Sequence, residues 1–334
     1  MHTLRKVFYY FLILVATLLI LLSMLSLIHN VADWYTKVLD FPRTQYLIVG
    51  IACLFLFVIF NRKWNAPSTL LMLGLGASIL VQGLFIAPYL VGDEAVPTAE
   101  RSAVDEQRSV SIMLANVLIT NDSTDALMEI VRKWNPDLLL TVEVNERWVE
   151  ALSPLEEEYP HTIKYPTDNA YGMAFYSKFP LEETELKFYH DDQDVPALVT
   201  QVTLPSGEDF MFYGAHPVAP VPSNRWPDGT SGKEKALIKI GKLVAEDELP
   251  AIVAGDFNDV SWSNTSRLFE MEGHLNNVRL GRGLYNTFDA NSAIMRWPLD
   301  HYFVSDDFAL LQLERLPGFG SDHFPMYAEF VLRR

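Results

Sequence analysis

A group of polar side chains follows a short apolar run in the C-terminal half of the chain. Residues 251–254 read Ala-Ile-Val-Ala and predict a buried strand, and Gly255 predicts a tight turn, so that Asp256 and Asn258 emerge at the strand end. One carboxylate and one amide at this spacing can point into the same cleft. Asp256 would hold a hard cation or a water molecule there, and Asn258 would hydrogen-bond a substrate oxygen. An ordinary strand-to-loop turn is the alternative.

Other polar residues lie at the ends of further predicted strands or in tight loops beside them. The set contains four acids, no cysteine and few histidines, which favours an oxygen-preferring ion such as Mg2+ or Mn2+ over zinc. The adjacent Asp322 and His323, with the distant Asp300, can form a general acid or base in which one carboxylate orients the imidazole and the other helps to hold metal. This chemistry suits phosphoester hydrolysis. The complete set is Asn116, Glu143, His216, Asp256, Asn258, Asp300, Asp322 and His323.

Eight short apolar runs predict the strands that position these residues, with helices between them. For two residues an ordinary role stays open, since Glu143 could face solvent and His216 could be packed in the core. Strands interleaved with helices imply sheets covered by helices. The strands are expected at 110–117, 138–143, 172–177, 197–204, 210–215, 251–254, 299–305 and 326–332, and the helices from a cap at 122 or 123 to 135, at 146–158, through 236–244 and at 262–272.

The first 91 residues contain three long uncharged runs, at about 7–28, 46–60 and 69–91. Each is long enough, or nearly so, to cross a bilayer as a helix. A signal peptide is the competing interpretation of the first run, but the run exceeds the usual apolar length and no cleavage site follows. Three such runs would be unusual among the buried helices of a soluble protein. We therefore expect a multi-pass anchor in the cell (inner) membrane.

Basic residues indicate how this anchor is oriented. Arg5 and Lys6 precede the first run, and Arg62 and Lys63 separate the second from the third. By the positive-inside rule these segments are cytoplasmic, which places the rest of the chain in the periplasm or outside the cell. Residues 92–108 lack periodicity and predict a linker, and 109–334 have the length of one large α/β domain.

The region after residue 91 is strongly acidic. It has 20 Lys plus Arg residues and 40 Asp plus Glu residues, a net charge of −20. Such a field repels polyanions and argues against a tight nonspecific grip on nucleic acid, although a nuclease with a locally basic or metal-bridged groove remains open.

Seven short motifs occur in one order along the domain, and with them the chain resembles the endonuclease/exonuclease/phosphatase superfamily over residues 109–332. It also looks like the bacterial members that carry short membrane helices before this domain. The motifs are the strand ending at Asn116, Asp137-Leu-Leu-Leu-Thr-Val-Glu143, Gly172-Met-Ala-Phe-Tyr-Ser177, Gly214-Ala-His216, Gly255-Asp-Phe-Asn258, Leu299-Asp-His301 and Gly320-Ser-Asp-His-Phe-Pro325.

The resemblance implies a four-layer α/β sandwich, DNase I-like, with the site at one edge of the packed sheets. A glutamate that pairs with the equivalent of His216 in some family nucleases has no identifiable counterpart here. The implied roles are Glu143 as main Mg2+ ligand with Asn116 and Asp322 nearby, Asp256 positioning or deprotonating the attacking water, Asn258 and His216 contacting phosphoryl oxygens, and His323, oriented by Asp300, stabilising developing charge or protonating the leaving group.

The expected function is that of a membrane-anchored, Mg2+- or Mn2+-dependent phosphodiesterase or phosphatase acting outside the cytosol. Its substrate could be a lipid headgroup, a small molecule or a nucleic acid. A metal-dependent nuclease is the alternative among enzymes. A noncatalytic adaptor is the alternative of another class, and all eight filled polar positions weigh against it. Membrane lipid around the helices is the expected partner, and no obligatory protein partner is predicted.

Overall fold

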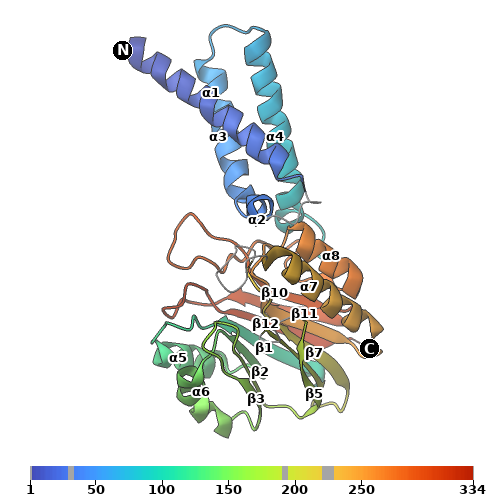
Figure 1. Ribbon diagram of the computed structural model, residues 1–334. Helices are drawn as coiled ribbons and strands as arrows, with labels where there is room; N and C mark the ends of the chain where they lie inside the picture. The colour runs from blue at the N-terminus through green and yellow to red at the C-terminus, as the bar shows by residue number, and fades with distance from the viewer. Residues whose placement is uncertain (1, 29–33, 190–194, 220–228, 334) are drawn as a thin grey trace.

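Two six-stranded sheets form the domain that follows the N-terminal helices (Figure 1). The structure is a computed structural model that describes residues 2–28, 34–189, 195–219 and 229–333. In each sheet one parallel pair of strands lies at the centre, and the other described pairs are antiparallel. The first sheet has the strand order β11 (Phe308–Arg315), β12 (Met326–Leu332), β1 (Ser109–Asn116), β2 (Leu138–Val142), β4 (Met173–Ser177), β3 (His161–Tyr165). The second sheet has the strand order β5 (Leu181–Phe188), β6 (Pro196–Thr203), β7 (Asp209–Ala215), β8 (Ala251–Asp256), β10 (Asp300–Val304), β9 (Asn276–Asn277).

Helices cover the outer faces of both sheets, while the inner faces pack on each other. The central core takes side chains from both sheets, among them Phe175 and Phe212, whose rings stack at 4.6 Å. The layers are therefore helix, sheet, sheet, helix, and the predicted four-layer DNase I-like α/β sandwich is confirmed. The helices are α5 (Thr124–Trp134) and α6 (Glu146–Leu152) with the 3-10 helix η4 (Ser153–Glu157) on the first sheet, and α7 (Gly229–Glu246) and α8 (Asn264–Gly273) on the second.

Local sequence accounts for most helix ends. Helix α5 stops at Asn135, which adopts a left-handed φ of 47° just before a proline. Helix α8 begins at 264 rather than the predicted 262 because the side chain of Ser263 caps it, accepting a hydrogen bond from the Ser266 amide. The predicted helix at 146–158 is divided into α6 and η4.

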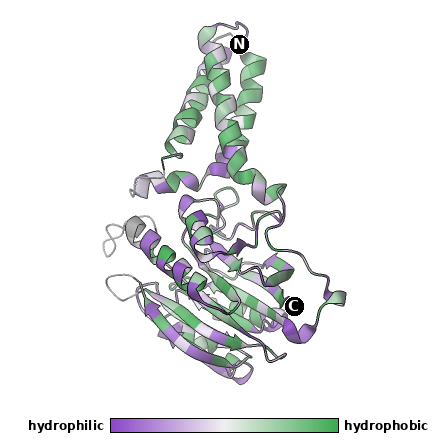
Figure 2. Ribbon diagram, turned by 90° about the vertical axis from the view of Figure 1, so that its right-hand side faces the viewer, coloured by the Kyte–Doolittle hydropathy of each residue, from purple (hydrophilic) through white to green (hydrophobic). Residues whose placement is uncertain are grey.

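Three long apolar helices precede the domain: α1 (His2–Leu25), α3 (Arg43–Phe60) and α4 (Ala66–Leu90). Each is long and apolar enough to cross a membrane, and Figure 2 shows them hydrophobic along most of their length. They start three to five residues before the predicted runs. Helix α4 starts early because Asn65 and Ser68 form a reciprocal cap around a proline in its first turn.

One end of the helix bundle packs against the domain (Figure 1). Between α1 and α3 lie the short helices α2 (Trp34–Lys37) and η1 (Val38–Asp40). The indole N–H of Trp262, which follows β8, donates to the Asp40 carbonyl at 2.7 Å, and the Trp262 ring lies edge-on to Tyr89 of α4. Around them an apolar cluster joins the two parts, with Ile86 on one side and Val260 and Leu299 on the other. The bundle is therefore in direct contact with the loops that follow β8 and precede β10.

The segment 92–108 runs along the domain surface to β1. Val96 is buried in the central core, and the backbone of 97–99 pairs with Leu310 of β11. The guanidinium group of Arg282 donates to Glu94 and Thr98, which fixes the start of the segment to the domain. The last of the three apolar helices is thus joined to the sandwich by a packed segment.

Candidate active site

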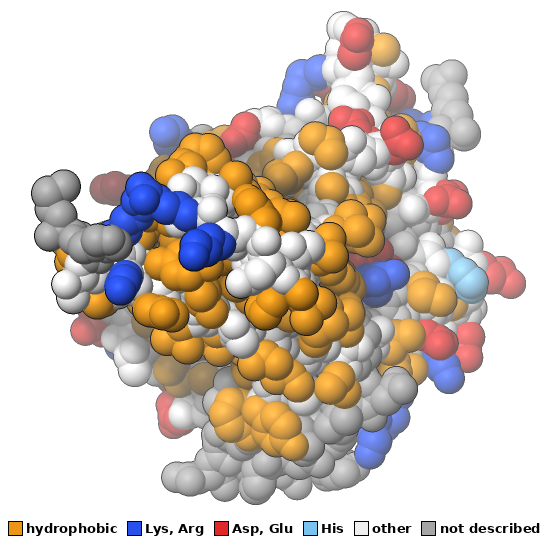
Figure 3. All heavy atoms as spheres, turned by 90° about the horizontal axis from the view of Figure 1, so that it is seen from above, with side chains coloured by type: hydrophobic (Ala, Val, Ile, Leu, Met, Phe, Trp, Pro, Cys, Tyr) orange, Lys and Arg blue, Asp and Glu red, His pale blue; other side chains and the backbone are white. Residues whose placement is uncertain are grey.

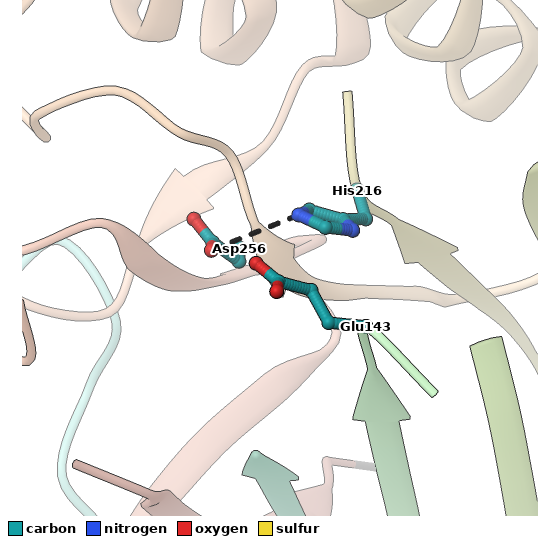
Figure 4. Close-up of side chains that lie close together, drawn as sticks. All are labelled: Glu143, His216 and Asp256. Carbon is teal, nitrogen blue, oxygen red and sulfur yellow. Dashed lines mark ion pairs between the residues drawn. The ribbon is translucent and has the colours of Figure 1, made fainter. Parts of the chain in front are cut away.

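Side chains from both sheets converge at the edge of the sandwich that faces the bundle. Asp256 at the end of β8 lies at their centre, with Oδ2 3.8 Å from His216 Nε2 and 3.6 Å from His323 Nε2. Figure 4 shows Glu143, His216 and Asp256 pointing toward one another, with the ion pair between the last two drawn as a dashed line. The structure therefore brings together residues that are up to 180 positions apart in the sequence.

Strand register places the acids. In the antiparallel pair β8–β10, Asp256 lies directly opposite Asp300. The turn predicted at Gly255 is wrong, because β8 continues through Asp256 and Gly255 pairs with His301. Glycine is required here for a different reason: a Cβ atom at position 255 would lie 1.8 Å from the Ala215 carbonyl oxygen of the neighbouring β7. The chain leaves the strand at Asn258, which has a left-handed φ of 51° that asparagine tolerates.

Asn116 at the end of β1 joins the carboxylates of the two sheets. Its side-chain amide donates to Glu143 at 2.8 Å and to Asp256 at 2.9 Å. The side-chain oxygen Oδ1 of Asn116 accepts a hydrogen bond from the Leu118 amide at 2.9 Å, so this oxygen points away from both carboxylates. Burial raises the pKa of Glu143, the Asn116 hydrogen bond lowers it, and the Asp256 charge raises it further. Two carboxylates held this close favour a cation between them.

The imidazole of His216, at the end of β7, is held in its uncharged form. Burial lowers the pKa of its imidazole to about 4, although the Asp256 charge acts in the opposite direction. Nε2 lies 3.2 Å from Asn258 Nδ2, which also donates to the Pro217 carbonyl. Nδ1 is buried and has no hydrogen-bond partner among the described residues, and the ring of Tyr171 lies 5.4 Å from the imidazole. No described glutamate pairs with His216.

His323 is held in the opposite state. Burial by itself would lower the pKa of its imidazole, but the Asp300, Asp256 and Asp322 carboxylates together raise it to about 10. Nδ1 hydrogen-bonds Asp300 Oδ2 at 2.8 Å, which directs Nε2 at Asp256. At neutral pH the side chain is therefore an imidazolium in contact with two carboxylates. Asp300 lies where it can orient this imidazole, and the role predicted for the pair stays a prediction.

Asp322 stands slightly apart from the other predicted residues. It is half-buried, and burial raises the pKa of its carboxylate, the His323 charge lowers it, and the Glu143 charge raises it again. Its backbone carbonyl accepts a hydrogen bond from the Ala290 amide at 2.7 Å. The two tight groups of possible metal ligands among the described residues do not include Asp322; they are Glu143, His216 and Asp256, and Asp256, Asp300 and His323, each with ligand atoms within 4.8 Å.

Several supporting residues carry no clear signal in the sequence. The ring of Phe288 lies 4.9 Å from the His323 ring, as Tyr171 lies against His216 on the other side. Thr287 Oγ1 accepts the Asp300 amide at 3.3 Å. The hydroxyl of Ser321 donates to the Asn116 carbonyl at 2.8 Å and accepts the His323 amide. Only Ser321 lies inside a recognisable motif, and it could have been found there.

The residues present fit a divalent cation. Glu143 and Asp256 are acceptor-only oxygen ligands from different sheets, held within reach of one another by one amide. Oxygen-rich sets of this kind suit Mg2+ or Mn2+. Two packed sheets with such a set at one edge define a metal-dependent phosphoester hydrolase of DNase I-like fold.

The sequence profile of the Endonuclease/Exonuclease/phosphatase family matches residues 113–323, and the chain belongs to this family. The predicted superfamily is thereby confirmed. No curated protein matches the chain in sequence.

Solved structures share the fold at low sequence identity. An endonuclease/exonuclease/phosphatase family protein from Bacteroides thetaiotaomicron is 19% identical with a TM-score of 0.54, covering 68% of this chain and 98% of its own. One from Bacteroides vulgatus is 18% identical with a TM-score of 0.56, covering 67% and 99%. TDP2 from D. rerio in complex with single-strand DNA product is 19% identical with a TM-score of 0.53, covering 66% and 98%.

Proposed function

We propose that the chain is a membrane-anchored, Mg2+- or Mn2+-dependent phosphodiesterase or phosphatase that acts outside the cytosol. The observation that supports it best is the central carboxylate of Asp256, flanked by a cationic and a neutral imidazole and joined through one amide to Glu143. The proposal gives these groups the separate tasks that phosphoester hydrolysis requires, which are activating water, stabilising charge and holding the phosphoryl group.

Each task falls to a residue with the matching charge. Asp256 orients and deprotonates the attacking water, because it is the acceptor at the centre of the site. His323 donates a proton from Nε2 to the leaving oxygen or stabilises its charge, and Asp300 keeps that imidazole protonated and oriented. His216 and Asn258 hold phosphoryl oxygens as neutral groups, Asn258 by turning toward the substrate the amide N–H that lies against His216 Nε2 in the free site.

Glu143 would be the main metal ligand, with Asp322 beside it. Asn116 would set the distance between Glu143 and Asp256, since its amide nitrogen contacts both. A divalent ion bound there supplies a positive charge that offsets the charge developing on the phosphoryl oxygens. Before the substrate binds, the carboxylates of Glu143, Asp256 and Asp322 would balance the charge of this ion.

The location outside the cytosol rests on the charges at the two ends of the bundle. Lys and Arg side chains gather at the end remote from the domain, which is nearest the viewer in Figure 3. Arg5, Lys6, Arg62 and Lys63 surround one hollow at that end. By the positive-inside rule this end is cytoplasmic, and the domain then lies on the other side of the membrane.

The test uses the full chain in nanodiscs, because residues of the domain are buried against the bundle. Hydrolysis of bis-p-nitrophenyl phosphate, DNA, RNA and phospholipid is measured with Mg2+ or Mn2+, with chelator, and in the variant His323→Ala. We expect metal-dependent turnover that chelator and the substitution both abolish. The control His161→Ala removes a histidine of β3 far from the site and should retain activity.

Two other results would contradict the proposal. Preferred hydrolysis of DNA or RNA would identify a nuclease. Absence of turnover on all four substrates together with absence of Mg2+ or Mn2+ binding by calorimetry would indicate a noncatalytic adaptor.

A further inference from the structure

A row of aromatic contacts leads from the membrane helices to the catalytic histidine. The ring of Phe41, just before α3, lies 5.7 Å from that of Trp297, which stacks on Phe288 at 6.2 Å. Phe288 in turn lies 4.9 Å from His323. Three ring contacts therefore separate the end of the bundle from the site, and the site edge of the sandwich lies close to the membrane surface.

The loop 289–296, here named the rim loop, connects the site with the bundle. Its ends are paired through the Phe288 amide and the Trp297 carbonyl at 3.0 Å. On the site side, the Ala290 amide donates to the carbonyl of Asp322, next to His323. On the membrane side, the side-chain amide of Gln45 in α3 donates to the Ile294 carbonyl at 2.9 Å. In Figure 1 the segments between α8 and β10 extend toward the end of the bundle near α2.

The tip of the rim loop is apolar and exposed. Ile294 is 75% exposed and Met295 46% exposed. The hydrogen bond from Gln45 holds this tip next to the first turn of α3. Trp34 and Tyr35 of α2 are also exposed at this end of the bundle. Exposed aromatic residues beside a membrane helix mark the headgroup layer of a bilayer. The loop tip is therefore at the depth where two exposed apolar side chains would meet lipid.

Two arginines lie beside the residue that follows His323 in the sequence. The guanidinium groups of Arg296 and Arg315 both lie over the ring of Phe324, at 5.0 and 4.4 Å from its centroid. Burial and the neighbouring charge of Arg296 lower the pKa of Arg315. Neither arginine forms an ion pair with any residue that the structure describes, although the domain is rich in carboxylates. Each donates one hydrogen bond to a backbone carbonyl, Arg296 to Ala290 and Arg315 to Asn286. Two adjacent cations over the residue that follows His323 suit an anionic oxygen of a bound ligand.

We propose that the substrate of this site is a phosphoester lipid of the same membrane that holds the anchor. Ile294 and Met295 enter the headgroup layer, and Arg296 and Arg315 bind anionic oxygens of the lipid headgroup. The lipid phosphate then reaches Asp256 and His323 along the rim loop. The inference rests on the proposed hydrolase function and adds the substrate class.

The activity test compares two substrates in the full chain. Nanodiscs of phosphatidylethanolamine and phosphatidylglycerol supply the lipid, and bis-p-nitrophenyl phosphate supplies a soluble diester. In the double variant Ile294→Ser and Met295→Ser, we expect the ratio of lipid to soluble hydrolysis to fall about tenfold. In Arg296→Gln with Arg315→Gln, the preference for the anionic phosphatidylglycerol should fall by a similar factor. The control Met271→Ser alters a 70% exposed methionine on α8 and should retain the wild-type ratio.

The outcomes separate the two proposals. Wild-type hydrolysis of the soluble diester without hydrolysis of either lipid, or an unchanged ratio in the loop variant, would overturn the lipid inference and leave the hydrolase intact. Hydrolysis of neither substrate with metal present would overturn the proposed function itself.

A second measurement is independent of activity. The only cysteine, Cys53, is replaced by serine, and a fluorophore is attached at Ile294→Cys or, as the matched control, at Met271→Cys. Nanodiscs containing headgroup-labelled nitroxide lipid should quench the probe at 294 much more than the probe at 271. Equal quenching at both positions would show that the rim loop does not reach the lipid.

Discussion

The two sides of the site contain equally buried histidines in opposite charge states. His216 is 3% exposed and His323 4% exposed, and both lie within 4 Å of Asp256. Yet the pKa is lowered to about 4 in the first and raised to about 10 in the second. Burial cannot account for the difference, because it acts on both in the same direction.

The difference comes from two additional carboxylates, Asp300 and Asp322, of which Asp300 raises the pKa of His323 the most. Asp300 contacts His323 Nδ1 at 2.8 Å, whereas the corresponding nitrogen of His216 has no hydrogen-bond partner among the described residues. Asp300 is available because it lies opposite Asp256 in the adjacent strand. The cross-strand pair of Asp256 and Asp300, together with the charge of Asp322, thus makes one of two similar histidines a cation, while the other stays neutral.

The largest effect is expected from removing the cation. The substitution His323→Ala should lower kcat for bis-p-nitrophenyl phosphate about a thousandfold, because the leaving oxygen loses its proton donor or its stabilising charge. Metal affinity, measured by calorimetry, should stay within a few-fold of wild type. A variant with nearly full activity would show that the charged side of the site does not take part in the reaction.

A smaller effect is expected from making the two histidines alike. Asp300→Asn keeps a side chain of the same shape beside His323 but removes its charge, so kcat should fall about a hundredfold. The raised pKa of His323 stabilises the fold fully below its ordinary value of 6.5, and this contribution is lost as the pH rises through about 10. The melting temperature of the wild type relative to the variant should therefore decline from neutral pH toward pH 10. A constant difference would mean that Asp300 does not keep His323 charged.

A still smaller effect is expected on the neutral side. His216→Gln replaces one uncharged hydrogen-bonding group with another, so kcat/KM should fall on the order of tenfold, the value of about one neutral hydrogen bond. The pH dependence of kcat should be unchanged, because the pKa of His216 lies below the range in which the enzyme would be measured. A shifted pH profile would indicate that His216 exchanges a proton during turnover.

The sequence predicted every central strand of both sheets and none of the four edge strands. The edge strands are β3, β5, β9 and β11. β5 reads Leu-Glu-Glu-Thr-Glu-Leu-Lys-Phe and exposes residues 182–185. β5 is shielded from pairing by charge and has little apolar surface to bury, so its pattern resembles a loop. β11 differs, because most of its residues are apolar and its first three are buried. Central strands must be apolar on both faces, which makes them visible in the sequence.

For the site, the motifs predicted which residues would gather, and the charge states needed the structure. Phe288 and Tyr171 have no distinctive spacing, and their contacts with the two histidines depend on loops that the sequence does not position. The burial of His216 and the contact of Asp300 with His323 are tertiary facts as well. The packing of the rim loop on Gln45 could not be predicted, because the residues are 249 positions apart.

A half-buried acid without a strong counterion should, like His216, favour its uncharged form. Burial raises the pKa of Glu270 in α8 to about 7, while the hydrogen bond from Asn277 and the Arg267 charge oppose the shift only in part. Between pH 4.5 and 7 the folded chain binds more protons than the unfolded chain, so this carboxylate lowers stability as the pH rises. Glu270→Gln removes the charge and can retain the Asn277 contact. We expect it to stabilise the full chain by on the order of 1 kcal/mol above pH 7, with the gain vanishing below pH 4.5.

Thermal unfolding in detergent at a series of pH values measures this gain, with Glu272→Gln as the control, because Glu272 is an exposed acid of the same helix. That control should show no comparable pH-dependent gain. If Glu270→Gln stabilises the chain equally at pH 4 and pH 8, burial does not govern this carboxylate. The different pKa values of His216 and His323 would then need another explanation. They could no longer be explained by burial that acts on both imidazoles and carboxylates that oppose it at His323.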